Sequence, residues 1–169
     1  MSIAYRDGKP GDGAAVADLF RESFVDTFGH LYAAEDLDAF VTGITTEAFE
    51  EELATPDFVF RLAEEEGTLA GFAKLGPDNL PGEVLPDTIS LYQLYVLEPW
   101  KGMGIAQVLM EWTIAEARRR RAKQLTLTVY IDNHRARRFY ARYRFQPVGS
   151  YAFMVGTHAD EDIIMRLAL

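Results

Sequence analysis

The segment that decides the fold is LYVLEPWKGMGIA, residues 94–106, where an apolar strand-like run leads through a proline and two glycines into a helical pattern. A strand that enters a helix through a glycine turn presents several backbone N–H groups at the helix N-terminus. Gly102, Gly104 and the small Ala106 leave these donors uncovered, so a pyrophosphate group has room to approach them. A plain strand-to-helix turn is the commoner explanation of the glycines alone. The turn by itself therefore leaves both interpretations open.

The residues before this segment predict a strand with an irregularity. Within residues 88–96 the apolar alternation falls on Ile89 and Leu91 and then moves to Leu94 and Val96. A change of phase of this kind is what a β-bulge produces, because one extra residue turns every later side chain to the other face. We therefore expect a bulged strand here.

The residues after the segment predict a helix, a strand and a second helix. Apolar side chains at helical spacing favour a helix from about Gly104 to Arg121, and strict alternation over residues 125–131 favours a strand. A helix is then expected from Asn133. Its apolar stripe consists of Ala136, Phe139, Tyr140 and Tyr143.

The remaining segments predict a mixed α/β sheet with helices packed on it. A strand at residues 3–6 precedes a helix at 12–29 that Asp12 can cap, and two short helices follow within 35–53. The other expected elements are a hairpin that turns at Glu66-Gly67, a loop at Gly76–Pro86, and final strands at 146–155 and 163–168.

Length and composition exclude several classes of protein. The 169 residues suit one domain, residues 1–169. The absence of Cys excludes disulfides and thiolate chemistry and is compatible with the cytoplasm, where we expect the protein to act. No signal peptide or membrane span is expected, since Arg6, Asp7 and Lys9 precede any apolar run.

Charge also constrains the partners. With 26 acidic and 17 basic residues the formal net charge is −9, which argues against a nucleic-acid partner. The excess negative charge suits a cationic substrate, and it is explained more simply by solubility. A homodimer is compatible with the sequence.

Residues 101–106, Lys-Gly-Met-Gly-Ile-Ala, resemble the acyl-CoA-binding motif Q/R-x-x-G-x-G/A of the GNAT superfamily of N-acetyltransferases, with Lys101 in the first position. This resemblance implies acetyl-CoA as cosubstrate. It also implies a mixed, mostly antiparallel sheet of about seven strands, flanked by helices, with a bulged fourth strand. In this family the exposed backbone of that strand, here Leu94-Tyr95-Val96, pairs with the pantetheine arm, and a main-chain N–H at the bulge polarises the thioester carbonyl.

A second resemblance to the same superfamily lies about thirty residues further on. Residues 133–145 resemble the pattern N-x-x-A-x-x-F-Y-x-x-x-G-F, with Arg144 in the glycine position. The match implies that Asn133 hydrogen-bonds the pantetheine amide and that Tyr140 protonates the departing CoA thiolate. Asn133 is also a good helix N-cap, and Tyr140 also fits an ordinary core position. The two motifs together imply a donor site formed by Leu94, Tyr95, Val96, Lys101, Gly102, Met103, Gly104, Ile105, Ala106, Gln107, Asn133 and Tyr140.

The group that deprotonates the amine is not evident from the sequence. Some relatives carry a Glu on the fourth or fifth strand, but Tyr92 and Thr128 occupy the matching positions here, and neither is a convincing base. We expect instead an ordered water chain or a carboxylate from Glu35–Asp38. The histidines, His30, His134 and His158, lack metal-ligand spacing, so no metal site is expected. Arg118–Arg121 is best explained as the basic end of a helix.

The chain is further similar to the PaiA-type polyamine acetyltransferases within the superfamily. The similarity rests on Phe28–Tyr32, Glu35–Leu37 and Phe40 in the early helices, and on Tyr151–Gly156 and Asp160–Met165 near the end. It implies direct transfer in a ternary complex to a small polyamine such as spermidine. The alternatives are a protein Lys or N-terminal acetyltransferase and a non-catalytic acyl-CoA sensor, against which the retained Tyr140 argues.

Overall fold

The computed structural model describes residues 2–83 and 85–169. Val84, in the predicted loop at 76–86, lies outside the described residues. Seven strands form one sheet in the order β1-β2-β3-β4-β5-β7-β6. The strands are β1 (Ala4–Asp7), β2 (Val59–Glu65), β3 (Thr68–Pro77), β4 (Thr88–Val96), β5 (Gln124–Tyr130), β6 (Gln146–Val155) and β7 (His158–Ala168).

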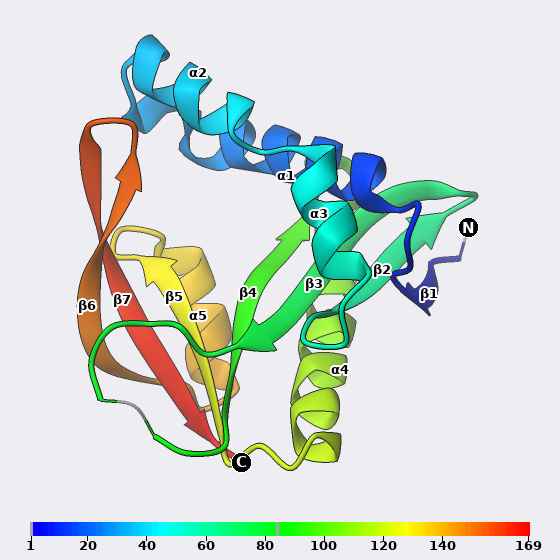
Figure 1. The fold of residues 1–169 in the computed structure, drawn as a ribbon, viewed down its shortest axis with the longest axis vertical. Coiled ribbons are helices and arrows are strands. Elements are labelled where there is room, and N and C mark those ends of the chain that lie inside the picture. The colour runs from blue at the N-terminus through cyan, green and yellow to red at the C-terminus, as the bar shows by residue number, and fades with distance from the viewer. Residues whose placement is uncertain (1, 84) are drawn as a thin grey trace.

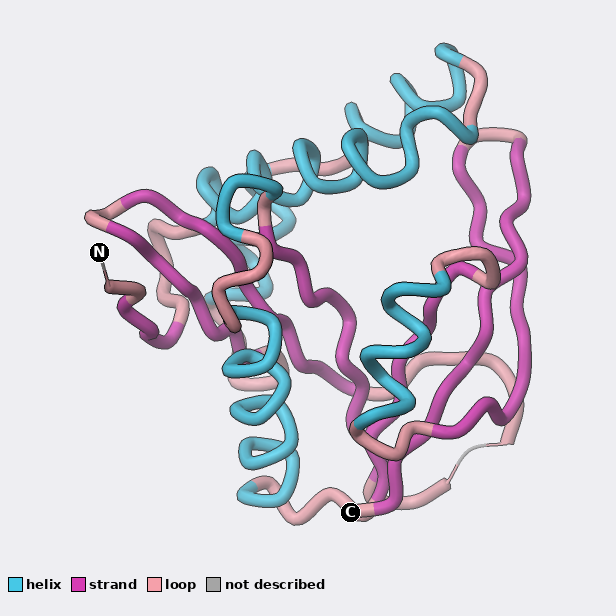
Figure 2. Tube along the Cα trace, turned by 180° about the vertical axis from the view of Figure 1, so that it is seen from behind, coloured by secondary structure: helices cyan, strands magenta, loops and turns pink. Residues whose placement is uncertain are grey.

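The helices follow the predicted order. They are α1 (Gly13–Phe28), α2 (Ala34–Thr42), α3 (Thr46–Leu53), α4 (Ile105–Arg119) and α5 (His134–Arg142), with 3₁₀ turns at Gly29–Leu31 and Glu98–Trp100. Figure 1 shows α1 and α2 across one end of the sheet, and Figure 2 shows α4 and α5 from the opposite side. None of the helices among the described residues is both long and apolar enough to cross a membrane.

The sheet divides between β4 and β5. These strands are parallel and pair only through Thr88–Ser90 with Gln124–Thr126 in the described part of the chain, whereas the other strand pairs are antiparallel. Beyond Ser90 the two strands diverge, as Figure 1 shows. The β5-facing edge of β4 is thus left without a neighbouring strand over its second half.

The predicted bulge in β4 is confirmed, and its position is defined by the pairing with β3. Lys74 lies opposite Gln93, whereas the next residue, Leu75, lies opposite Leu91. Tyr92 is therefore the extra residue. Tyr92 lies just before Leu94–Val96, the segment in which the change of phase was expected from the sequence. The apolar alternation shows its new phase only after the bulge, and this explains the difference.

Two apolar clusters lie on opposite faces of the sheet. Leu62 and Phe72 pack with α1 and α3, whereas their neighbours Ala63 and Ala73 belong to the cluster that includes α4. Successive strand residues point to opposite faces, so large residues on one face and small ones on the other let helices cover both. The parts of α1 and α4 that face the sheet are thereby fixed in position.

Two predictions about element ends were wrong. Asp12 stands before α1 but makes no side-chain cap, because Arg6 holds its carboxylate with two hydrogen bonds of 2.8 Å each. The last strand begins at His158, five residues before the predicted Ile163. Acidic residues at 160–162 hid the strand pattern, since carboxylates are rare in strands.

A buried ion pair connects α3 to β3. The Lys74 side chain is buried, and its Nζ donates to the two Glu52 oxygens at 2.9 and 3.0 Å. The same ammonium lies 4.8 Å from the ring centre of Tyr92 and 5.3 Å from that of Phe58. Burial lowers the pKa of Lys74, and the Glu52 carboxylate opposes that shift. The charge is therefore held in place by one carboxylate and several aromatic faces.

Candidate active site

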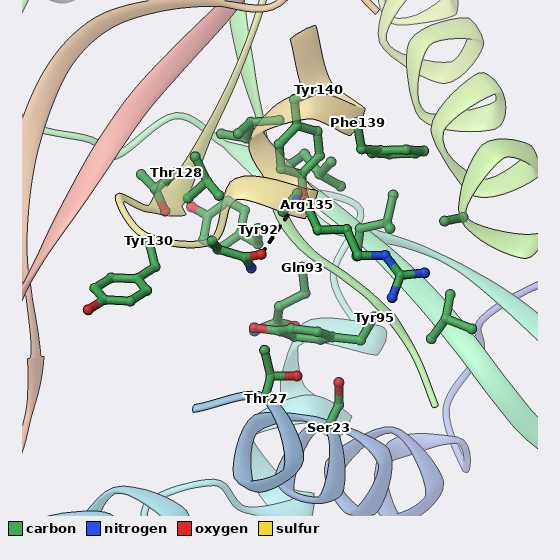
Figure 3. A pocket seen from close by; sticks show the side chains of 18 of the residues that line it. Ser23, Thr27, Tyr92, Gln93, Tyr95, Thr128, Tyr130, Arg135, Phe139 and Tyr140 are labelled. Carbon is green, nitrogen blue, oxygen red and sulfur yellow. Dashed lines mark hydrogen bonds between the residues drawn. The ribbon is translucent and has the colours of Figure 1, made fainter. Parts of the chain in front are cut away.

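A pocket of about 1020 Å³ lies where β4 and β5 diverge. Its wall includes the second half of both strands, the buried side of α1, the N-terminal ends of α4 and α5, and parts of β6 and β7. Figure 3 shows Tyr140 and Phe139 on one side of this pocket and Ser23 and Thr27 of α1 on the other, with Tyr95 between them. The site is therefore assembled from segments that are far apart in the chain.

The β4 wall offers both backbone and side chains. Leu94, Tyr95 and Val96, which the resemblance assigned to the donor site, all line the pocket. Because β5 has diverged at this point, backbone N–H and C=O groups of β4 that point toward β5 have no strand partner among the described residues. Such an edge is able to pair with an extended amide-bearing chain, as an added strand would.

The glycine turn and the start of α4 form the next part of the wall. Gly102 and Gly104 both have φ of +82°, and an added Cβ at either would meet nothing within 4 Å. The first turn of α4 carries no acidic residue, so its free N–H groups and the positive end of the helix dipole remain available to an anion. Both glycines are thus required for backbone conformation and for open space.

The predicted residues of this turn are brought together with one exception. Met103 is 48% exposed and is not part of the pocket wall, whereas its neighbours are. Lys101 lines the pocket and pairs with Glu98 at 2.8 Å. The turn residues in the wall are Lys101, Gly102, Gly104, Ile105, Ala106 and Gln107.

Helix α5 carries Asn133 and Tyr140 to the pocket. Asn133 Oδ1 accepts the Ala136 N–H at 3.3 Å, so it caps α5 and lines the pocket at once. Burial raises the pKa of Tyr140 to about 12, which keeps the phenol protonated at neutral pH. Arg144, in the glycine position of the motif, adopts φ of +71°, so the chain keeps the left-handed turn that glycine usually supplies.

Two arginines that the sequence analysis did not single out also line the pocket. Arg135 lies in the first turn of α5 and Arg142 in the last, and both belong to the pocket wall. Arg119 and Arg120, in contrast, pair with Glu116 at the far end of α4. The sequence feature that could have pointed to Arg135 and Arg142 is the basic composition of residues 135–142.

Asp162 is another wall residue that sequence reasoning missed. It lies on β7, opposite Tyr130 of β5 and Tyr151 of β6, and is 7% exposed. Burial raises the pKa of the Asp162 carboxyl to about 7, and the charge of Asp160 adds to this effect. A pKa near neutrality is typical of groups that exchange protons during catalysis. The sequence feature that could have revealed this site is the pair Asp160 and Asp162, since residues at alternate positions of a strand share one face.

The carboxylates expected from Glu35–Asp38 lie elsewhere. None of the four residues lines the pocket, and Asp36 instead accepts the Thr157 N–H at 2.9 Å. That bond ties α2 to the turn between β6 and β7. Tyr92 and Thr128 do line the pocket, and the Tyr92 hydroxyl donates to the Pro77 carbonyl oxygen at 2.5 Å. Within the described residues, no three His, Asp or Glu side chains are grouped to hold a metal ion.

Comparisons with known proteins agree with this geometry. Residues 14–145 match the model of the acetyltransferase (GNAT) family. The chain is 28% identical over 153 residues to an N-acetyltransferase of Lactobacillus delbrueckii, with 89% of this chain and 88% of the relative covered.

Solved structures share the fold. The PaiA N-acetyltransferase of Thermoplasma acidophilum, determined in complex with coenzyme A, has a TM-score of 0.80 at 20% identity, with all of both chains covered. The ribosomal-protein-S18-alanine N-acetyltransferase of Escherichia coli has a TM-score of 0.71 at 18% identity, with 99% of this chain and 94% of that one covered. The chain therefore belongs to the GNAT family of N-acetyltransferases, enzymes that take the acetyl group from acetyl-CoA.

Proposed function

We propose that this enzyme acetylates a primary amine of a small polyamine-like molecule by direct attack in a ternary complex. The observation that carries the proposal is one pocket with Tyr140 on one wall and the buried Asp162 on another. A protonated polyamine is attracted to buried carboxylates, and the phenol is a proton donor for a leaving thiolate. The resemblance of the chain to PaiA-type enzymes supports the same substrate class.

The donor half of the pocket would hold acetyl-CoA through main-chain groups. The free edge at Leu94–Val96 would pair with the amides of the pantetheine arm, and the Asn133 side-chain amide would add a hydrogen bond. The pyrophosphate would accept from N–H groups in the turn at Gly102–Gln107, with Arg135 nearby as a counter-charge. Acetyl-CoA supplies an activated acetyl thioester, and the protein holds it beside the acceptor half of the pocket.

Gly104→Ala should raise the Kd for CoA about tenfold. The methyl group would strain the left-handed backbone and enter the space in front of the α4 N-terminus. Isothermal titration with CoA measures the effect. Gly67→Ala is the matched control, since Gly67 has φ of +81° and open space but lies at a hairpin tip. An unchanged Kd for CoA in Gly104→Ala would show that this turn does not bind the pyrophosphate.

The acceptor itself is tested with a panel of amines. Spermidine and spermine should release CoA thiol from acetyl-CoA at a kcat/KM at least about tenfold above that for aminoglycosides or peptides, a preference of about 1.4 kcal/mol. A thiol-reactive dye measures the release. A faster reaction with peptides would show that the acceptor is a protein and not a polyamine.

A protein N-terminus is the second candidate, because the E. coli structure that shares this fold is named for acetylating a ribosomal-protein alanine. The contacts between α2 and the β6–β7 hairpin favour a small amine. Asp36 of α2 holds the β6–β7 turn through Thr157, and Phe40 of α2 packs on Phe153 of β6 with ring centres 5.7 Å apart. These contacts restrict the room for a polypeptide chain.

A further inference from the structure

The acceptor end of the pocket contains a buried carboxylate without a counter-charge. Asp162 is 7% exposed and lines the pocket. Among residues 2–83 and 85–169, no side chain forms a hydrogen bond or ion pair with its carboxylate. A buried charge without a partner is costly, so native proteins retain one mainly where a ligand completes the site.

The neighbouring carboxylate is already engaged. Asp160 accepts a hydrogen bond from the Tyr32 hydroxyl, and its other oxygen lies 3.1 Å from His158 Nε2. Both carboxylates occupy the same face of β7, two residues apart. Asp160 therefore contributes negative charge to Asp162 while its own oxygens have protein partners, and Asp162 is left to face the pocket.

Four tyrosine hydroxyls lie within electrostatic range of this carboxylate, three on β4, β5 and β6 and one just after the turn at Gly29–Leu31. Burial raises the pKa of Tyr151 on β6, and the charge of Asp162 adds to the shift. The same charge contributes, after burial, to the raised pKa values of Tyr32, Tyr95 and Tyr130. Tyr130 also donates to Asp132 at 3.2 Å. Among the described residues, no basic group contributes to the pKa of Asp162, so the charge missing at this carboxylate is positive.

Tyr95 connects this end of the pocket to the donor end. Burial raises the pKa of the Tyr95 hydroxyl, and electrostatic interactions with Tyr140 and Asp162 add to the shift, so Tyr95 lies within electrostatic range of each. Its ring packs on Phe20 of α1 with centres 5.2 Å apart, which fixes its position. Tyr95, Tyr140 and Asp162 all line the same pocket, so the proton acceptor and the proton donor face one cavity.

We propose that Asp162 binds the ammonium group of the acceptor and takes its proton before attack. This inference rests on the proposed function, because it assigns the acceptor half of that same site. The free amine nitrogen then forms a bond to the thioester carbonyl carbon while the carbon–sulfur bond breaks. The CoA sulfur takes the Tyr140 proton, and the amide nitrogen returns one to the phenolate. The net reaction releases one proton, through Asp162.

The mechanism predicts a pH profile with a distinctive shape. Wild-type kcat/KM should rise as Asp162 ionises near its pKa of about 7. It should then stay level up to the pKa of the amine, about 10.4 for a lysine-like group, because the protonated amine is the form that binds. Asp162→Asn has no carboxylate to accept the proton. Its kcat/KM should keep rising tenfold per pH unit over that range, because only the free amine reacts.

The experiment compares Asp162→Asn with wild type on the best acceptor found in the amine panel. We expect kcat/KM at pH 7.5 to fall about 100-fold or more, with the Kd for CoA unchanged. Asp132→Asn serves as the control, since Asp132 is exposed and outside the pocket wall. The Kd for CoA, measured by titration, shows that the variant is folded.

The outcomes separate this inference from the proposed function. One outcome is that wild type prefers an amine that is not a polyamine, and that Asp162→Asn shows the altered pH profile of kcat/KM with that amine. This result would refute the proposed substrate class and support the role of Asp162. If spermidine is the substrate and Asp162→Asn keeps wild-type kcat/KM and profile shape, the role of Asp162 is overturned and the function stands. A lower kcat/KM with the wild-type profile shape would also overturn proton transfer to Asp162, because a purely structural role would leave the shape unchanged.

Discussion

Tyr140→Phe is expected to lower kcat by about 100-fold while the Kd for CoA stays within twofold of wild type. The change removes only the hydroxyl, and the ring keeps its contacts with Phe139 and Phe145, whose ring centres lie 5.5 and 5.9 Å away. A hundredfold loss corresponds to about 2.7 kcal/mol of transition-state stabilisation. Single-turnover thiol release measures the chemical step, and titration with CoA measures binding.

The control and the pH dependence make this result specific. Tyr5→Phe changes a phenol on β1, outside the pocket wall, and should leave kcat unchanged. Because burial places the pKa of Tyr140 at about 12, wild-type activity should show no decline from loss of this proton below about pH 11. Equal kcat in wild type and Tyr140→Phe would exclude Tyr140 as the proton donor to the thiolate.

Glu52→Ala is expected to destabilise the protein by about 3–5 kcal/mol, because it leaves the buried Lys74 ammonium without its carboxylate. For a chain of this size the midpoint of thermal unfolding should fall by about 10 °C. Thermal denaturation followed by circular dichroism measures the shift. Glu51→Ala, an exposed position on the same helix, should change stability by less than about 0.5 kcal/mol.

The sign of the pH dependence follows from the direction of the Lys74 shift. Burial already lowers the pKa of Lys74, and removing Glu52 lowers it further, so the unfolded chain binds this proton more tightly than the folded one. The stability of Glu52→Ala should therefore increase as pH rises toward the unfolded pKa of lysine. Adding Lys74→Met should restore most of the lost stability. A double variant as unstable as Glu52→Ala would show that the loss does not come from the unpaired charge.

Much of the fold followed from local pattern. The alternation at residues 125–131 and the helical spacing around Ala136 and Phe139 gave β5 and α5 to within one or two residues. The Gly102–Gly104 turn was recognisable because only glycine adopts its backbone conformation freely. These features depend on near neighbours in the chain, so the sequence alone was enough to place them. The donor-site residues that it suggested by resemblance stay a prediction.

The part of the pocket that contains Asp162 could be recognised only from the tertiary structure. The sequence shows Asp160 and Asp162 only as acids near the C-terminus, and Lys74 only as a charge in a strand. Their burial depends on the β6–β7 hairpin reaching α2 and on α3 packing over β3. The pKa of a side chain is set by the desolvation and charges around it. The pKa of Tyr32, for example, is raised by burial and by Asp160, which lies 128 positions away in the chain.

The sequence by itself thus determined the family, the order of elements and the turn that is suited to a pyrophosphate. Only the tertiary structure decided where β4 and β5 separate, which residue forms the bulge, and which buried carboxylate lines the pocket. The physical reason is the range of the interactions: backbone conformation is governed by adjacent residues, whereas burial and electrostatics are summed over everything that the fold brings together.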